Sequence, residues 1–148
     1  MKKLLLLSLL LGLASCASSK ADRSPSAVTL IRAGGFSGLE NRFRIEANGH
    51  ATKSMRFPKQ DEKTVADTML SANTVAPIFS YLDRNLDTLL TLKLDETGNM
   101  TTTLILHYGA QSHMLRWPNL EPPILATKKL DSLYNYVAPV EEWLSATQ

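Results

Sequence analysis

The sequence predicts an α+β domain: an antiparallel sheet, made of two hairpin or meander units, with its helices packed on one face. Two regions repeat apolar residues at helical spacing, and several shorter segments are β-branched or alternate apolar with polar residues. Turn residues such as Asn48-Gly49 separate the short segments, as is typical of hairpins. Since runs of hairpins alternate with single helices, we expect the order β-β-β-α-β-β-β-α.

Three strands are predicted in the first unit. Residues 28–32 are apolar and β-branched, and residues 42–47 alternate apolar with charged side chains, which indicates a half-buried strand. The pair Asn48-Gly49 is a strong hairpin signal, because both residues tolerate positive φ. The third strand, residues 51–57, alternates again and is ended by Pro58.

A helix is predicted after these strands. Residues 59–63 form a charge run that we interpret as solvated, and residues 67–70 are interpreted as a short turn. Because proline is tolerated in the first turn of a helix, Pro77 places the N-cap at Asn73 or Thr74. The expected apolar face consists of Val75, Ile78, Phe79, Leu82 and Leu86.

The second unit is predicted to repeat this order of elements. Residues 90–94 alternate leucine with polar residues and predict a strand. A turn at 95–99 leads into a second strand, residues 101–108. A further turn at 109–111 precedes the last strand, residues 113–117.

The chain ends in a second helical region. After a loop over residues 118–123, Thr127 is the expected N-cap of a helix, and Pro139 is expected to restart the chain as a short second helix. That short helix carries Trp143 and the acidic pair Glu141-Glu142, which we interpret as solvated. The buried face is predicted to consist of Leu130, Leu133, Tyr134 and Val137.

Residues 1–15 have the pattern of a secretory signal peptide, a basic start followed by an apolar run. This run is shorter than the roughly 20 residues that a membrane-spanning helix needs. The segment Leu13-Ala-Ser-Cys16 resembles the lipobox of bacterial lipoproteins, whose cysteine is lipidated. The resemblance implies an anchor on Cys16 in the cell envelope, and Ala17 in place of aspartate implies the outer membrane.

The remaining chain is predicted to be a tether followed by one domain. Residues 16–26 are small and polar after the cysteine and predict a flexible tether, and residues 27–148 have the length of a single globular domain. The 16 basic residues include Lys2 and Lys3, so the processed chain has as many basic as acidic residues. Without a basic patch, nucleic-acid binding has no support.

Enzyme signatures are thin, and we predict no catalytic residue, no cofactor and no metal site. His107 and His113 could face each other across the turn at 109–111, but no third ligand is suggested by spacing, and ordinary strand histidines are favoured. The only cysteine, Cys16, is committed to lipid. The glycines lack the spacing of a dinucleotide or phosphate loop.

The segment RAGGFSG, residues 32–38, holds three of the seven glycines. The stretch from Val28 to Leu39, with the following alternating strand and Gly49, resembles the start of the emfourin family of small bacterial inhibitors of thermolysin-like metalloproteases. Gly98-Asn99 and Trp117 resemble a related group of small lipoproteins with the same GGF-S/T-G opening. The resemblance implies a shared fold and, as function, protease inhibition.

Two classes of function follow. In the first, the protein is an interaction module that presents an exposed Phe36 to a thermolysin-like protease or another envelope protein. In the second, it is a structural or small-ligand-binding envelope lipoprotein, and Phe36 lies in the core. Trp117 has the same two interpretations, and its core position is favoured. The candidate partner-binding residues are Gly34, Gly35, Phe36, Ser37, Gly38 and Trp117.

Overall fold

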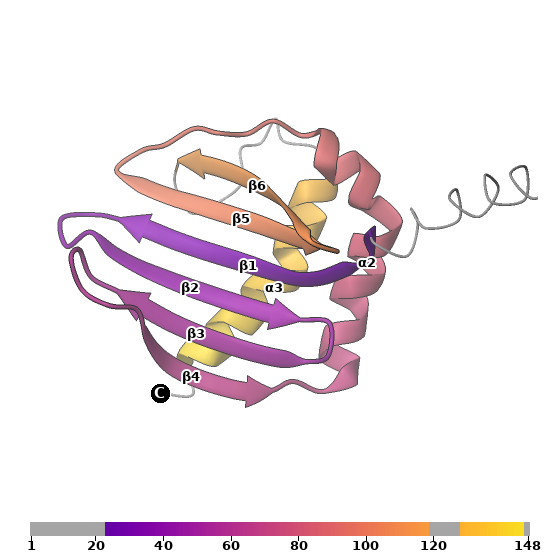
Figure 1. Ribbon diagram of the computed structural model, residues 1–148, viewed down its shortest axis with the longest axis horizontal. Helices are drawn as coiled ribbons and strands as arrows, with labels where there is room; N and C mark the ends of the chain where they lie inside the picture. Colours follow the sequence, from indigo (N-terminus) through magenta and orange to yellow (C-terminus); the bar gives the residue numbers. More distant parts are fainter. Residues whose placement is uncertain (1–22, 119–127, 147–148) are drawn as a thin grey trace, which may run out of the picture.

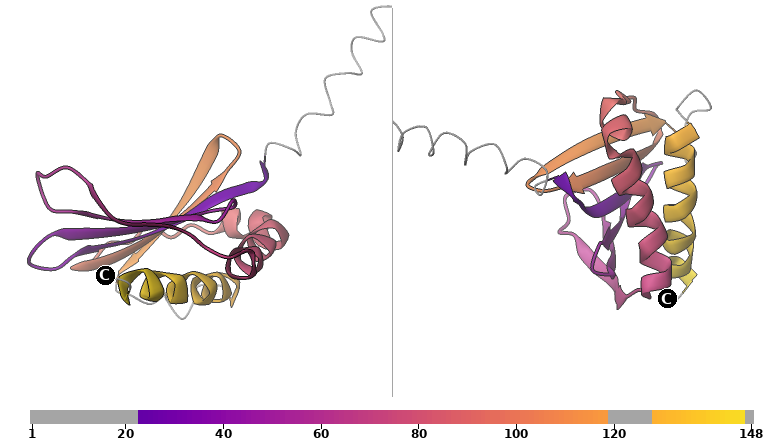
Figure 2. Two further views of the ribbon diagram at one scale, coloured as in Figure 1. Left: turned by 90° about the horizontal axis from the view of Figure 1, so that it is seen from below. Right: turned by 90° about the vertical axis from the view of Figure 1, so that its right-hand side faces the viewer.

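The computed structural model describes residues 23–118 and 128–146, which form a six-stranded sheet and two helices (Figure 1). The strands lie in the order β4-β3-β2-β1-β5-β6, and all neighbouring strands are antiparallel. Both helices lie on one face of the sheet, as Figure 2 shows, which confirms the predicted α+β class. The elements are β1 (Pro25–Gly34), β2 (Leu39–Glu46), β3 (His50–Arg56), β4 (Lys63–Met69), α2 (Ala72–Thr91), β5 (Met100–Tyr108), β6 (Gln111–Pro118) and α3 (Lys128–Ala146).

The alternation in β2 separates the two faces of the sheet. Phe43 and Ile45 are buried in the core under the helices, whereas Arg42 and Arg44 lie on the opposite face. β1 pairs with β2 on one side and β5 on the other, and residues 27–31 are buried without interruption. This central position explains why residues 28–32 contain few polar residues.

The core lies between the sheet and the two helices. Each fully buried leucine or isoleucine there contributes about 1.5–3 kcal/mol by leaving water. The expected face of α2 is confirmed, with Phe79 at its half-buried margin, and Leu89 extends it. The buried apolar residues of the helices are Val75, Ile78, Leu82, Leu86 and Leu89 in α2, and Leu130, Leu133, Val137, Val140 and Leu144 in α3.

The division of strands between the two units differs from the prediction, because Lys63–Met69 forms β4. The charge run at 59–63 and the turn at 67–70 both overlap this strand. β4 is an edge strand whose pairing with β3 includes a bulge between Lys53 and Ser54. Most of its side chains are exposed or half-exposed, so hydrogen bonding to β3 rather than apolar alternation specifies it.

The strand predicted at residues 90–94 is wrong. Leu90 and Thr91 end α2, because Leu89 continues the buried face of that helix by one more turn. The next residues run beside β6, where the Arg116 amide donates to the Leu94 carbonyl over 2.8 Å. This contact continues only as an isolated bridge between Asp95 and Arg116. The described order is therefore β-β-β-β-α-β-β-α.

Both helices accommodate a proline beyond the first turn. α2 has Ser71 as its N-cap, so it begins before the predicted Asn73 or Thr74 and carries Pro77 inside. α3 is continuous through Pro139 and does not restart there. Each proline ring is exposed, and the buried residues on both sides hold the helix against the sheet. Packing thus outweighs the lost backbone hydrogen bond.

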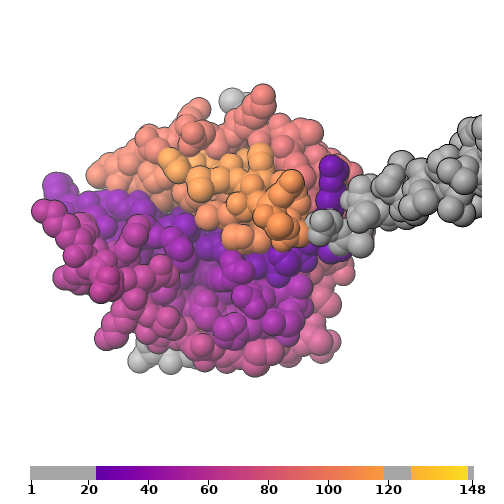
Figure 3. All heavy atoms as spheres, in the orientation of Figure 1, coloured from indigo at the N-terminus to yellow at the C-terminus, as the bar shows by residue number. Residues whose placement is uncertain are grey.

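No described element covers the other face of the sheet, which forms the front in Figure 3. Its side chains make ion pairs along and between strands. Glu40 pairs with Arg42 and Arg56. On the same face, His50 and Asp67 share a hydrogen bond of 2.7 Å. Half-exposed pairs of this kind contribute about 0–1 kcal/mol each to the free energy of unfolding. Their main effect is therefore to keep this face polar.

The predicted signal peptide (1–15), lipidated Cys16, the start of the tether and the N-cap Thr127 lie outside the described residues. Within residues 23–118 and 128–146, neither helix is long and apolar enough to cross a membrane.

Candidate functional site

The turn between β1 and β2 carries the most exposed aromatic residue among the described residues. Phe36 is fully exposed, whereas Gly34, Gly35 and Gly38 have positive φ values of 123°, 73° and 61°. Glycine adopts such values without the steric penalty that a Cβ brings. The Leu39 amide donates to the Ser37 hydroxyl over 3.3 Å, which closes the turn. Phe36 therefore projects outward, as the interaction-module hypothesis requires.

Neighbouring segments fix this turn in place. The Gly35 amide donates to the Asn99 carbonyl over 2.8 Å, directly before β5. A Cβ on Gly34 would lie 2.0 Å from the same carbonyl oxygen, and a Cβ on Gly38 would lie 2.7 Å from the ring of Pro58. These approaches are too close for any side chain. The glycines thus let three segments of the chain pack against one another.

The turn between β3 and β4 lies at the same end of the sheet (Figure 1). The Gln60 amide donates to the Phe57 carbonyl over 3.1 Å, and Lys59 has a φ of 63°. Phe57 and Met100 are also partly exposed there. We call this end the loop pole and define it as residues 34–38, 57–60 and 98–100.

A cleft of about 310 Å³ opens between the two turns of the loop pole. Glu40 lies in it and accepts hydrogen bonds from Arg56 over 2.7 Å and from Arg42 over 3.0 Å. Partial burial alone would raise the pKa of Glu40, but the hydrogen bonds from Arg56 and Arg42 outweigh it and lower that pKa. The carboxylate is therefore ionised and already paired. The cleft is lined by Gly38, Glu40, Arg56, Phe57, Pro58, Lys59 and Gln60.

Trp117 does not belong to the loop pole surface. Its side chain is fully buried and packs edge-on against Tyr134, with 6.3 Å between ring centroids. The bulky indole fills the space between β6 and α3, so it offers no surface to a partner. As a partner-binding residue Trp117 is thus a wrong assignment, and its core interpretation holds.

Glu141 is also buried rather than solvated. Its carboxylate forms a salt bridge with the guanidinium of Arg32 in β1. Nε of Arg32 lies 2.6 Å from Oε1 of Glu141, and an Nη of Arg32 lies 2.7 Å from Oε2. The Tyr134 hydroxyl accepts from Arg32 over 2.8 Å. Arg32 lies in β1 two residues before Gly34, so this pair ties the base of the turn to α3.

The two histidines considered as metal ligands lie on opposite faces of the sheet. In the pairing of β5 with β6, His107 is opposite Ser112, and His113 is opposite Leu106. His107 contacts Thr29 and Arg44, whereas Nε2 of His113 donates to the Leu92 carbonyl over 3.0 Å. Among the described residues, no group of three or more histidine, cysteine or acidic side chains is placed to hold a metal ion.

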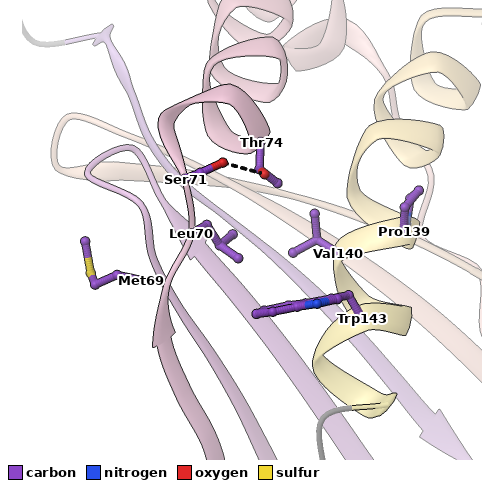
Figure 4. Close-up of a pocket in the computed structure, with 7 residues that line it drawn as sticks. All are labelled: Met69, Leu70, Ser71, Thr74, Pro139, Val140 and Trp143. Atoms are coloured by element: carbon purple, nitrogen blue, oxygen red, sulfur yellow. Dashed lines mark hydrogen bonds between the residues drawn. The ribbon is translucent and has the colours of Figure 1, made fainter.

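A second hollow, of about 400 Å³, lies away from the loop pole, between the start of α2 and the second half of α3 (Figure 4). Met69, Leu70, Val140 and Trp143 give it an apolar wall, and Trp143 is half-exposed. The hydroxyls of Ser71 and Thr74, 3.0 Å apart, form its polar side. This shape suits a small apolar molecule with one polar group.

No family model matches this sequence, and a comparison with curated proteins finds no significant similarity. The function is therefore argued from the surfaces themselves. Of the candidate partner-binding residues, 34–38 lie in the turn between β1 and β2 at the loop pole, and Trp117 lies in the core. Phe57 and Lys59 were missed, because only Pro58 marks a turn there, and nothing in the sequence places that turn against Gly38.

Proposed function

We propose that this protein is a lipid-anchored envelope protein whose loop pole binds another protein. The observation that carries the proposal is the full exposure of Phe36 on a turn that backbone hydrogen bonds hold in place. Phe57 and Met100 are also partly exposed at this pole, and a large aromatic at the centre of such an apolar surface is typical of residues that enter a hollow on a partner. Because the turn is already ordered, binding requires little loss of conformational freedom.

We further propose that the partner is a thermolysin-like metalloprotease and that binding inhibits it. The resemblance of residues 28–39 to the emfourin family supports this choice. The shape of the loop pole agrees with it, since a projecting turn fits a concave surface such as a protease cleft. The position of the proposed lipid anchor, Cys16, supports it too. Cys16 precedes β1 in the sequence, and β1 begins at the opposite end of the sheet from the turn (Figure 1).

The test is a titration of thermolysin with the full chain purified in detergent. Inhibition is expected at micromolar concentration or below. Phe36→Ser should weaken it about 30-fold or more, the loss expected for a central interface residue. Tyr136→Ser, a change of a half-exposed aromatic on α3, is the matched control and should leave inhibition unchanged. An unmodified chain that neither binds nor inhibits the protease at micromolar concentration would rule out this function.

The alternative function is binding of a small apolar ligand, and the hollow beside Trp143 favours it (Figure 4). The fluorescent probe N-phenyl-1-naphthylamine, whose emission rises in apolar surroundings, tests this alternative. Saturable binding that quenches tryptophan emission and is abolished by Leu70→Asp would support it. Trp143→Phe should keep binding and reduce the quenching, because Trp143 lines the hollow and Trp117 does not. Absence of saturable binding would exclude the binding of small apolar ligands that resemble this probe.

A further inference from the structure

The turn Phe57–Gln60 holds a lysine where backbone geometry favours glycine. Its hydrogen bond from the Gln60 amide to the Phe57 carbonyl, Pro58 at its second position and the positive φ at Lys59 match a type II turn. Lys59 is the only non-glycine residue with positive φ within the described ranges. This conformation costs an L-residue with a long side chain about 1–2 kcal/mol. Glycine or asparagine would fit the turn with less strain.

The position of the strained lysine gives it a distinct electrostatic role. Lys59 lines the cleft next to Gly38, within the loop pole. The one carboxylate lining this cleft, Glu40, is already held by Arg42 and Arg56. Lys59 itself makes no ion pair with any described residue, the neighbouring Asp61 and Glu62 included. The cleft lining therefore carries two cations, Arg56 and Lys59, against one carboxylate.

We propose that the turn Phe57–Gln60 is the second half of the protein-binding surface, and that Lys59 pairs with a carboxylate of the partner beside the hollow that receives Phe36. This inference rests on the proposed function, since it concerns the same pole. The net positive cleft selects an acidic side chain over a basic or apolar one. The turn places Lys59 in the same cleft lining as Gly38, and strained backbone conformations of this kind are often found at binding sites.

The experiment measures association of thermolysin with the full chain in detergent, at low salt and at about 0.5 M salt. Lys59→Glu should slow association about tenfold at low salt, and the difference should shrink as salt screens the charges. Lys59→Asn, which keeps the turn, should weaken binding about threefold and leave the midpoint of thermal unfolding equal or higher. Lys59→Arg should bind like the unmodified chain. Lys128→Glu, the same charge change on α3, is the matched control.

The outcomes separate the two proposals. If the unmodified chain binds and inhibits the protease but Lys59→Glu has the association rate and salt dependence of the unmodified chain, this inference is overturned and the proposed function stands. If the unmodified chain does not bind the protease, both this inference and the proposed function are overturned. Binding instead to vesicles of anionic lipid by a Cys16→Ser chain, lost in both Phe36→Ser and Lys59→Glu, would assign the pole to a lipid surface and also overturn the inference.

Discussion

Gly34 is the residue on which the geometry of the exposed turn depends most. Its φ of 123° is unfavourable for other residues, and a Cβ would lie 2.0 Å from the Asn99 carbonyl oxygen, which is backbone and cannot rotate away. Gly35→Ala meets only the flexible Met100 side chain, at 3.5 Å. We expect Gly34→Ala to lower the free energy of unfolding by about 3 kcal/mol and Gly35→Ala by about 1 kcal/mol. Urea unfolding measures both, and equal losses would show that the contact with Asn99 is unimportant.

His107 makes the stability of the sheet depend on pH. Burial and then the nearby Arg44 guanidinium lower the pKa of His107. Arginine can only donate, so the contact of 3.3 Å from Arg44 to Nε2 requires that nitrogen to be an unprotonated acceptor. Because the folded-state pKa lies below the unfolded value of about 6.5, this stability is complete above pH 6.5 and is lost as the pH falls through the folded-state value.

Replacement of His107 by glutamine should therefore flatten the pH dependence of stability. Between pH 7.5 and 5.5, the urea midpoint of the unmodified chain should fall, and that of His107→Gln should fall less. His50→Gln, the same substitution on the same face of the sheet, is the matched control. A pH dependence that is identical with and without His107 would assign the effect to other groups.

The contact between Arg32 and Glu141 fixes α3 against β1. Both side chains are largely buried, at 19% and 10% exposed, so removal of one partner leaves a charge with little water around it. Glu141→Ala should lower the free energy of unfolding by about 3 kcal/mol. This value is at the low end of the range for a broken buried ion pair, because the Arg32 side chain remains partly exposed. The double change Arg32→Met with Glu141→Leu should recover most of this loss. Urea unfolding of the three variants tests it, and a double variant as unstable as Glu141→Ala would contradict the role of the unpaired charge.

The sequence predicts the elements that bury an apolar face and misses those that pairing specifies. The alternation at 42–47 and the helical spacing from Val75 to Leu86 both correspond to real elements, since each buries its apolar side. β4 has no such pattern, because it is an exposed edge strand that hydrogen bonds to β3. The leucines at 90–94 alternate by chance, since Leu89 and Leu90 still belong to α2. Local sequence patterns do not indicate which segments pair with each other in the sheet.

The same distinction applies to the candidate site. The glycine cluster identified residues 34–38, because glycines so close together indicate backbone that no other residue can adopt. The partners of that turn, Asn99 and Pro58, come from two distant parts of the chain and carry no pattern of their own. The sequence favours the core for Trp117 without excluding an interface, since an aromatic at a strand end fits both.

Across the whole molecule, the strand β1 separates the two ends that the proposed function uses. Its ten residues rise about 3.3 Å each, so the turn with Phe36 lies about 30 Å from the start of the strand at Pro25. The predicted lipid anchor precedes that start, and the helices pack on a face of the sheet rather than at either end (Figure 2). An anchor at one end leaves the loop pole free at the other, so anchoring and partner binding should be separable.

Two substitutions should separate them. Cys16→Ser should abolish incorporation of labelled palmitate and move the protein out of the membrane fraction, because one free hydroxyl replaces the lipidated thiol and stable anchoring needs acyl chains. Its inhibition of thermolysin should remain that of the unmodified chain. Phe36→Ser should show the reverse, with unchanged membrane fractionation and weakened inhibition. Labelled palmitate on the Cys16→Ser chain would disprove the anchor, and a loss of inhibition in that variant would show that the two ends are coupled.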